Sequence, residues 1–341
     1  MSAGAQSVGG QSVATAAATV AEPAPAPAAP APPAVVYVTA ADVDAKRESV
    51  SKTDPAGQTE FAKWLLREAA RLPDAPSSHD LKHKMFDEAM AGVRRQAEGY
   101  GSGAARNGWP EAQFFLAECY RKGAFGTSKN LDKAYALYTK ASKAGHSPAT
   151  YYRGLCCELG HGTKVNETKA LTMFRTAAQA GVTAAALKLG VIYQRGLLRQ
   201  KPNEANALLW LKRAAADVNT AAQVVAATEA GETGGDEAAT PEAASRMAAM
   251  ASRNVYALHA CWLLGLHYEK GRAGDDHEKG FQFFLDAAEL GYAPAMFKVG
   301  MCLRDGVGID RNPAEATEWF AAAAAAGVGS LGEITNLPLP V

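Results

Sequence analysis

The chain has 341 residues, and its 35 Lys and Arg residues balance 35 Asp and Glu residues. A net charge of zero argues against nucleic-acid or anionic-membrane binding driven by bulk electrostatics. The five cysteines include no Cys-x-x-Cys pair, and the N-terminus resembles no signal peptide, so we expect a reducing compartment.

Residues 1–55 are rich in Ala, Ser and Pro, and six prolines fall between positions 23 and 33. Proline breaks helices, and the stretch has few large apolar residues, so we expect a disordered, partly extended arm. Its apolar run is alanine interrupted by proline, which is not typical of a transmembrane helix.

Two amphipathic helices are predicted next, over residues 60–72 and 79–99, and we expect Ser78 to cap the second. The apolar faces comprise Phe61, Trp64, Leu65 and Ala69 in the first, and Met85, Phe86, Ala89 and Val93 in the second. Residues 56–109 are therefore expected to form an N-terminal helical cap or a divergent repeat, because a stack of repeats needs its exposed end covered. An inserted loop is expected over 102–109.

Residues 110–327 repeat a two-helix unit with a period of 36–37 residues. The first helix has a small residue at position 0 and Gly or Ala at +5, and Gly usually follows at +11; the second has bulky residues at +3 and +4 between two small ones. Glycine inside a helix costs about 1 kcal/mol, so we expect a neighbouring helix to approach closely at +5. Good N-cap residues recur before the second helices, at Asn130, Asn166, Asn203, Asp276 and Asn312.

The interval from Asn203 to Asp276 is twice the period, which predicts a degenerate fourth copy between them. Thr240 and Pro241 would begin its second helix, and residues 220–230 would form its first. The chain is thus predicted to be all-α, a right-handed α-solenoid of about six repeats behind a helical cap. Residues 328–341 are expected to be a disordered tail.

No sequence motif supports an enzyme, a cofactor or a metal site. His79 and His83 are one helical turn apart but lack a third ligand, and the acidic run from Asp275 to Glu278 suits a helix start. Cys119, Cys156 and Cys302 share position +7 of the first helix and are interpreted as small buried hydrophobes. We therefore expect no catalytic residue.

Positions +3 and +10 of the first helices point away from both packing faces. If these helices line a concave wall, the two rows form a groove of apolar patches edged by cations, suited to a peptide with some acidic character. An equally supported alternative is that the large apolar residues at +3 fill gaps between copies. The predicted groove consists of Phe115, Lys122, Tyr152, Leu159, Lys188, Arg195, Leu263, Lys270 and Lys298.

The two helix signatures, clearest over 260–271 and 315–324, resemble the Sel-one-like repeat, a relative of the tetratricopeptide repeat. Particular stretches further resemble the fungal chitin synthase regulatory factors: residues 61–70, 79–97, 117–126 with its Gly-Ala-Phe-Gly turn, 188–198 and 210–215. The resemblance implies a non-catalytic adaptor that binds and positions or activates a chitin synthase in cell-wall or septum synthesis.

Some members of that family end in a prenylatable Cys box, whereas this chain ends Leu-Pro-Leu-Pro-Val. We therefore expect a cytoplasmic protein without a lipid anchor, which reaches the plasma membrane or septum through its partner. Alternatives on the same repeat are a scaffold for kinase or cell-cycle signalling and an endoplasmic-reticulum degradation adaptor. A hydrolase, as claimed for some secreted Cys-rich repeat proteins, is the alternative of a different class. This chain lacks the paired cysteines of those proteins.

Overall fold

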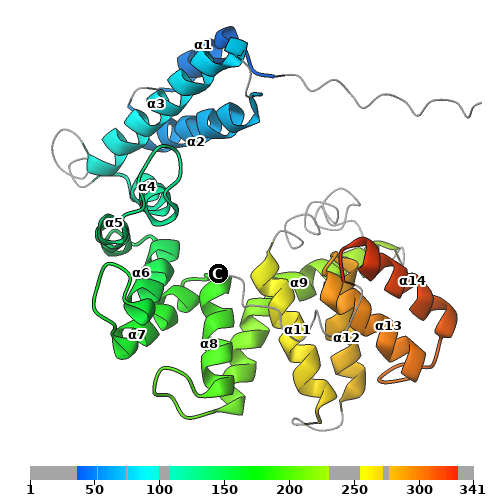
Figure 1. Cartoon of the computed structure of the whole chain (residues 1–341). Helices are drawn as coiled ribbons and strands as arrows, with labels where there is room; N and C mark the ends of the chain where they lie inside the picture. Colours follow the sequence, from blue (N-terminus) through cyan, green and yellow to red (C-terminus); the bar gives the residue numbers. More distant parts are fainter. Residues whose placement is uncertain are drawn as a thin grey trace, which may run out of the picture. The chain divides into compact units, whose positions relative to one another are not determined.

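The computed structural model describes residues 37–51, 53–73, 76–99, 108–229, 254–271 and 276–328, of which 76–78, 217 and 219–229 are described by backbone alone. The described residues form helices joined by short turns (Figure 1). The helices are α1 (Ala40–Glu48), α2 (Pro55–Arg71), α3 (Pro76–Glu98), α4 (Pro110–Lys122), α5 (Leu131–Lys143), α6 (Ser147–Leu159), α7 (Glu167–Gln179), α8 (Thr183–Arg195), α9 (Glu204–Glu229), α11 (Val255–Glu269), α12 (His277–Glu289), α13 (Ala293–Asp305) and α14 (Pro313–Ala325).

The predicted caps lie at the starts of the second helices. The side-chain oxygen of Asn130 accepts from the Lys133 N–H at 2.9 Å, and Asn166 and Asn203 make the equivalent bond at the same distance. These bonds satisfy N–H groups that have no partner within the helix. Asp276 precedes α12 without capping it, because its carboxylate binds Lys279 Nζ at 2.7 Å instead. Thr240 lies outside the described residues.

Each first helix packs on the second helix of its own copy through the small residue at +5. A Cβ atom built on Gly154 of α6 would lie 2.7 Å from the ring of Phe174 in α7, and one on Gly300 of α13 would lie 2.9 Å from Phe320 in α14. Real Cβ atoms do not approach this closely, so glycine is required opposite Phe174 and Phe320. The expected close approach at +5 is confirmed, and it explains glycine in mid-helix despite its poor propensity.

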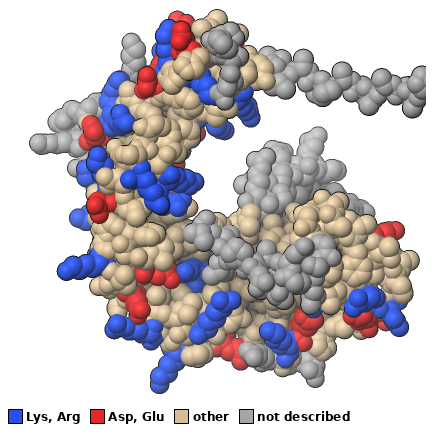
Figure 2. Space-filling model, viewed as in Figure 1, with Lys and Arg blue, Asp and Glu red and all other residues tan. Residues whose placement is uncertain are grey.

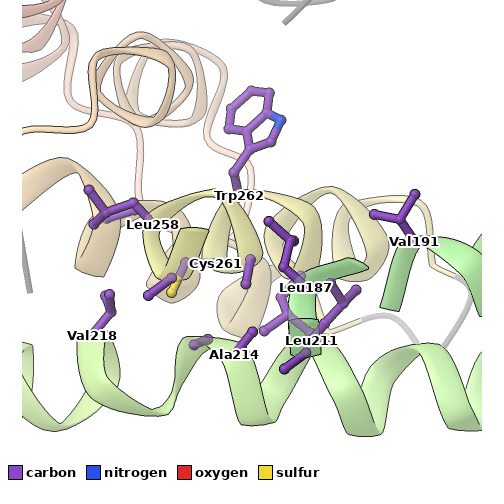
Figure 3. Packing of buried hydrophobic residues seen from close by; sticks show 14 of the residues in the cluster. Leu187, Val191, Leu211, Ala214, Val218, Leu258, Cys261 and Trp262 are labelled. Atoms are coloured by element: carbon purple, nitrogen blue, oxygen red, sulfur yellow. The ribbon is translucent and has the colours of Figure 1, made fainter. Parts of the chain in front are cut away.

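The prediction that residues 220–230 form the separate first helix of a fourth copy is wrong, and its predicted second helix lies outside the described residues. Residues 220–229, expected to begin a new helix pair, continue α9, which is one helix of 26 residues. The next element in the stack is α11, which contacts α9 and α8 directly. Leu211 and Val218 of α9 share one core with Leu258 and Trp262 of α11 (Figure 3). Among the described helices, α11 therefore follows α9 in the stack, and the described helix pairs correspond to the five ranges of the Sel-one-like repeat.

The N-terminal region contains more structure than the composition predicts. The expected arm was assigned to residue 55, yet α1 spans residues 40–48 within it. Thr39 and Asp42 cap this helix reciprocally, and Val43 is buried in the core that α2, α3 and α4 share. The predicted apolar faces of α2 and α3 do lie in that core, which they share with α4, and their role as a cap or a divergent repeat stays a prediction. The first 36 residues and residues 329–341 lie outside the described part.

Candidate partner-binding surface

Two predicted groove lysines lie in the joints between consecutive copies. Lys188 Nζ of α8 lies 3.0 Å from a carboxylate oxygen of Glu158 in α6 and 6.0 Å from the ring centre of Phe174 in α7. The next such joint repeats the arrangement: Lys298 Nζ lies 2.6 Å from Glu269 and 5.9 Å over the ring of Phe284. Cation and carboxylate are both largely shielded, so each pair links one copy to the next.

The first joint uses different residues at the same positions. Tyr152 of α6 stacks on Tyr138 of α5 with ring centres 5.5 Å apart, and the guanidinium of Arg121 lies 5.3 Å over the Tyr152 ring. The Glu118 carboxylate accepts hydrogen bonds from the Tyr138 hydroxyl and from two nitrogens of the Arg121 guanidinium. Burial would raise the pKa of Glu118, but these bonds outweigh it and lower that pKa.

The nine predicted groove residues thus divide by position. Those at +3 pack at joints: Leu263 lies against the main core, and Phe115 packs on the N-terminal core. Those at +10 sit at the C-terminal ends of the first helices and are exposed, namely Lys122, Leu159, Arg195 and Lys270. Partner binding by any of the nine stays a prediction, and only the +10 residues present most of their side chains to a partner.

The turn after each first helix adds a feature that the sequence patterns did not single out as a site. Two residues past the helix-ending glycine the backbone is left-handed in four copies, and Gly162 and Gly308 hold this position with φ 66° and 73°. Phe125 holds it in the first copy with φ 53°, and Leu198 in the third with φ 50°. Large side chains are strained in this conformation, by about 1–2 kcal/mol each.

Phe125 closes one side of a cavity of about 370 Å³ between α2 and the turn after α4. We call it the turn pocket; its lining residues are Glu60, Lys63, Leu66, Arg67, Ala70, Phe115 and Phe125. The ring centre of Phe125 lies 6.2 Å from that of Phe115 and 6.1 Å from that of Phe86 in α3. Its side chain nevertheless remains 37% exposed. Phe115 is thus brought beside a second aromatic ring that sequence reasoning did not pair with it.

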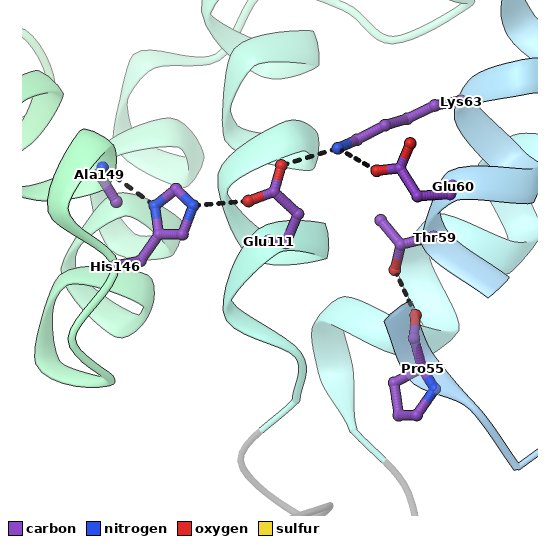
Figure 4. Close-up of polar contacts among 7 residues, drawn as sticks. All are labelled: Pro55, Thr59, Glu60, Lys63, Glu111, His146 and Ala149. Atoms are coloured by element: carbon purple, nitrogen blue, oxygen red, sulfur yellow. Dashed lines mark hydrogen bonds and ion pairs between the residues drawn. The ribbon is translucent and has the colours of Figure 1, made fainter. Parts of the chain in front are cut away.

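A polar network fixes one wall of the turn pocket (Figure 4). Lys63 Nζ binds Glu111 at 2.7 Å and Glu60 at 2.9 Å, and the other oxygen of Glu111 lies 2.7 Å from His146 Nε2. The His146 Nδ1 atom accepts the Ala149 N–H at 3.1 Å and so caps α6. Burial would raise the pKa of Glu111, but Lys63 and His146 outweigh it and lower that pKa. Helices α2, α4 and α6 are therefore tied together through one carboxylate.

The remaining candidate residues gain no chemistry from the fold. The Nε2 atoms of His79 and His83 lie 3.2 Å apart on an exposed face, and the described residues contain no group of three side chains suited to a metal. Cys119, Cys156 and Cys302 are buried, and burial raises the pKa of each thiol to about 11, which makes them poor nucleophiles.

Charge and hydropathy of the surface match the balanced composition. Lys and Arg side chains are interspersed with Asp and Glu on the face in Figure 2, with no extended area of one sign. Among the helices that the structure describes, none combines the length and apolar character needed to cross a membrane.

Two curated fungal proteins are similar to most of this chain. Chitin synthase regulatory factor 3 of Schizosaccharomyces pombe is 25% identical over 300 residues, which cover 85% of the chain and 28% of that protein. Chitin synthase regulator SKT5 of Saccharomyces cerevisiae is 28% identical over 338 residues, covering 83% of the chain and 48% of that protein. The resemblance to fungal chitin synthase regulatory factors is thus confirmed, and the chain spans less than half the length of either relative.

Solved structures agree on the fold. A Sel1 repeat protein from Oxalobacter formigenes is 24% identical, with a TM-score of 0.53, over 73% of this chain and 83% of that one. The profile of the Sel1 repeat matches residues 110–146, 147–182, 183–217, 258–292 and 293–328. These matches cover more than half of the sequence, follow the helix pairs of the structure, and establish that the chain belongs to the Sel1 repeat family, as an α-solenoid.

Proposed function

We propose that this chain is a non-catalytic adaptor that binds a chitin synthase and regulates it in fungal cell-wall or septum synthesis. One observation carries the proposal: the similarity to named chitin synthase regulators extends beyond the Sel1 repeats. The alignments with the two regulators cover 85% and 83% of the chain. Residues 110–341, which comprise the repeats and everything after them, make up a smaller share than that, so the alignments must extend into the residues before 110. The similarity therefore includes the N-terminal helices, which lie outside the ranges that match the Sel1 repeat.

The arrangement of side chains supports binding and not catalysis. The described polar clusters, at the joints and at Glu111, consist of carboxylates already paired with cations or hydroxyls, and they hold helices together. What the stack offers to a partner is surface, comprising the exposed ends of the first helices and the turn pocket. In this proposal the protein is cytoplasmic and reaches the plasma membrane or septum through the synthase.

Capture from fungal membranes tests this function. The tagged full chain is incubated with detergent-solubilised yeast membranes, and bound proteins are identified by mass spectrometry. The Oxalobacter formigenes Sel1 protein serves as a control, because it shares the fold and so reports nonspecific capture by repeat surfaces. Enrichment of a chitin synthase over this control is expected. Enrichment of soluble kinases or cell-cycle regulators alone would instead support the signalling scaffold.

Synthase activity provides the second readout. Added chain is expected to change the rate of chitin formation by membranes from cells that lack their own regulator, while the chain alone forms no chitin. A captured synthase whose rate is unchanged by the chain would limit the proposal to binding, and regulation would then be rejected.

A further inference from the structure

We propose that the turn pocket receives a segment of the partner that carries one large aromatic or apolar side chain next to a carboxylate. This inference rests on the proposed function for the identity of the partner, but the chemistry of the occupant follows from the pocket alone. The segment would insert its apolar side chain against Phe115 and Phe125 and place its carboxylate at Arg67.

The first argument is the backbone strain of Phe125, which adopts a left-handed conformation. The Sel1 copies that place glycine at the equivalent position, Gly162 and Gly308, adopt the same left-handed conformation without strain. A phenylalanine there costs folding free energy, and more than a third of the residue remains exposed despite its contacts with Phe86 and Phe115. A strained, half-exposed aromatic at the mouth of a cavity indicates a binding role.

The second argument is the shape and polarity of the cavity. Leu66, Ala70, Phe115 and Phe125 provide apolar walls, and the volume of about 370 Å³ accommodates one aromatic side chain. Aromatic anchors that fill such pockets contribute most of the affinity in many protein interfaces.

The third argument is an exposed arginine at the rim that forms no ion pair among the described residues. Lys63 is committed to Glu60 and Glu111, whereas Arg67 is exposed and makes no ion pair within the described residues. An arginine at the edge of an apolar pocket attracts a carboxylate and repels lysine or arginine in a competing segment. The occupant therefore carries a carboxylate near its apolar side chain.

A matched pair of small probes tests the pocket without any partner. N-acetyltryptophan carries an aromatic ring and a carboxylate, and N-acetyltryptophanamide carries the ring alone. Saturation-transfer NMR with the full chain is expected to give at least a threefold larger signal for the carboxylate probe. Phe125→Gly should abolish the signal, and Arg67→Gln should remove the preference between the probes.

The Phe125→Gly variant avoids the usual ambiguity of unfolding, because glycine relieves backbone strain at this position and the melting temperature should hold or rise. Leu198→Gly is the matched control, since it makes the same change at the same position of another copy and should leave probe binding unaltered. Equal probe binding by wild type and Phe125→Gly would overturn the proposal. So would loss of binding in Leu198→Gly to the same extent.

Capture of the chitin synthase then separates this inference from the proposed function. Phe125→Gly and Arg67→Glu are each expected to reduce capture at least tenfold, and Leu198→Gly to leave it unchanged. If wild type and both pocket variants capture the synthase equally, the pocket inference is wrong and the adaptor function stands. If Phe125→Gly increases capture, a segment of this chain occupies the pocket, which also rejects the inference. If wild type captures no synthase, the adaptor function is wrong, and the probe experiment alone decides on the pocket.

Discussion

Phe284 of α12 packs on the backbone of α11 at Gly265, so closely that a Cβ atom at Gly265 would lie 2.4 Å from Cε1 of the ring. The same pairing of a small residue at +5 with a bulky residue at +4 joins the helices of the other copies. This pairing sets the distance between the two helices of a copy. That distance in turn positions the residues that contact the next copy.

Replacing Gly265 by alanine should destabilise the protein. Alanine gains about 1 kcal/mol of helix propensity, but the methyl group forces the Phe284 ring to move within a packed core, at about 1–3 kcal/mol or more. We expect the loss to dominate, because the clash is with a fully buried ring that also packs against Trp262 of α11. Thermal and urea unfolding followed by circular dichroism measures the change.

Gly92→Ala is the matched control for this substitution. A Cβ atom at Gly92 of α3 would meet only Ala62 Cβ at 3.9 Å, which is ordinary contact. Helix propensity then acts alone, and we expect a gain of about 0.5–1 kcal/mol. If both substitutions shifted stability in the same direction, the close packing at +5 would not be what requires glycine.

The pair Lys188 and Glu158 should show a measurable coupling energy. Their side chains are 20% and 16% exposed, so screening by solvent is weaker than at the surface. A double-mutant cycle with Lys188→Met and Glu158→Gln is expected to give about 1–2 kcal/mol. The same cycle on the exposed pair Lys279 and Asp276, 63% and 40% exposed, should give a clearly smaller coupling energy, because solvent screens this pair. Equal couplings would show that the joint pair contributes no more than a surface pair.

His259 should make the protein less stable in mild acid. Burial, with the charge of Arg195, lowers the pKa of His259 to about 4, and one ring nitrogen lies 2.9 Å from the Tyr292 hydroxyl. The unfolded chain then binds a proton that the folded chain does not bind between about pH 6.5 and pH 4. The contribution of neutral His259 to the free energy of unfolding is therefore fully present above pH 6.5. It is lost as the pH drops through this window, and the loss at pH 5 is about 2 kcal/mol.

Comparison of variants isolates this contribution. His259→Gln keeps a hydrogen-bonding group beside Tyr292 but cannot take up a proton, so its stability should change less between pH 7 and pH 5. His277→Gln, which replaces an exposed imidazole at the start of α12, should retain the wild-type pH dependence. Parallel curves for wild type and His259→Gln would refute the assignment.

The caps should differ in importance although they share one position in the repeat. Asn166→Ala removes an acceptor that binds the Lys169 N–H at 2.9 Å and should cost about 1 kcal/mol. Asp276→Ala should cost less, because the Asp276 side chain accepts no backbone N–H of α12. Urea unfolding of the two variants tests this order, and an equal or larger loss for Asp276→Ala would contradict the geometry.

Local patterns in the sequence determined the helices and their pairing. The period, the capping asparagines and the alternation of small and bulky residues act within a few turns of helix, so they can be read from residues near in sequence. They fixed the starts of α5, α7, α9 and α14 and the close contacts at +5. The resemblance to chitin synthase regulators rested on the same local strings.

Only the tertiary structure decided which segments belong to the stack and which side chains remain available. The interval of two periods between Asn203 and Asp276 predicts another helix pair, but the structure shows that residues 220–229 continue α9 and that α11 packs on α9. Likewise, the position of Lys188 in its helix does not predict its ion pair with Glu158. The Gly-Ala-Phe-Gly string does not predict the contact between the rings of Phe125 and Phe115. These contacts join different helices, and their energies depend on distances that no local pattern encodes.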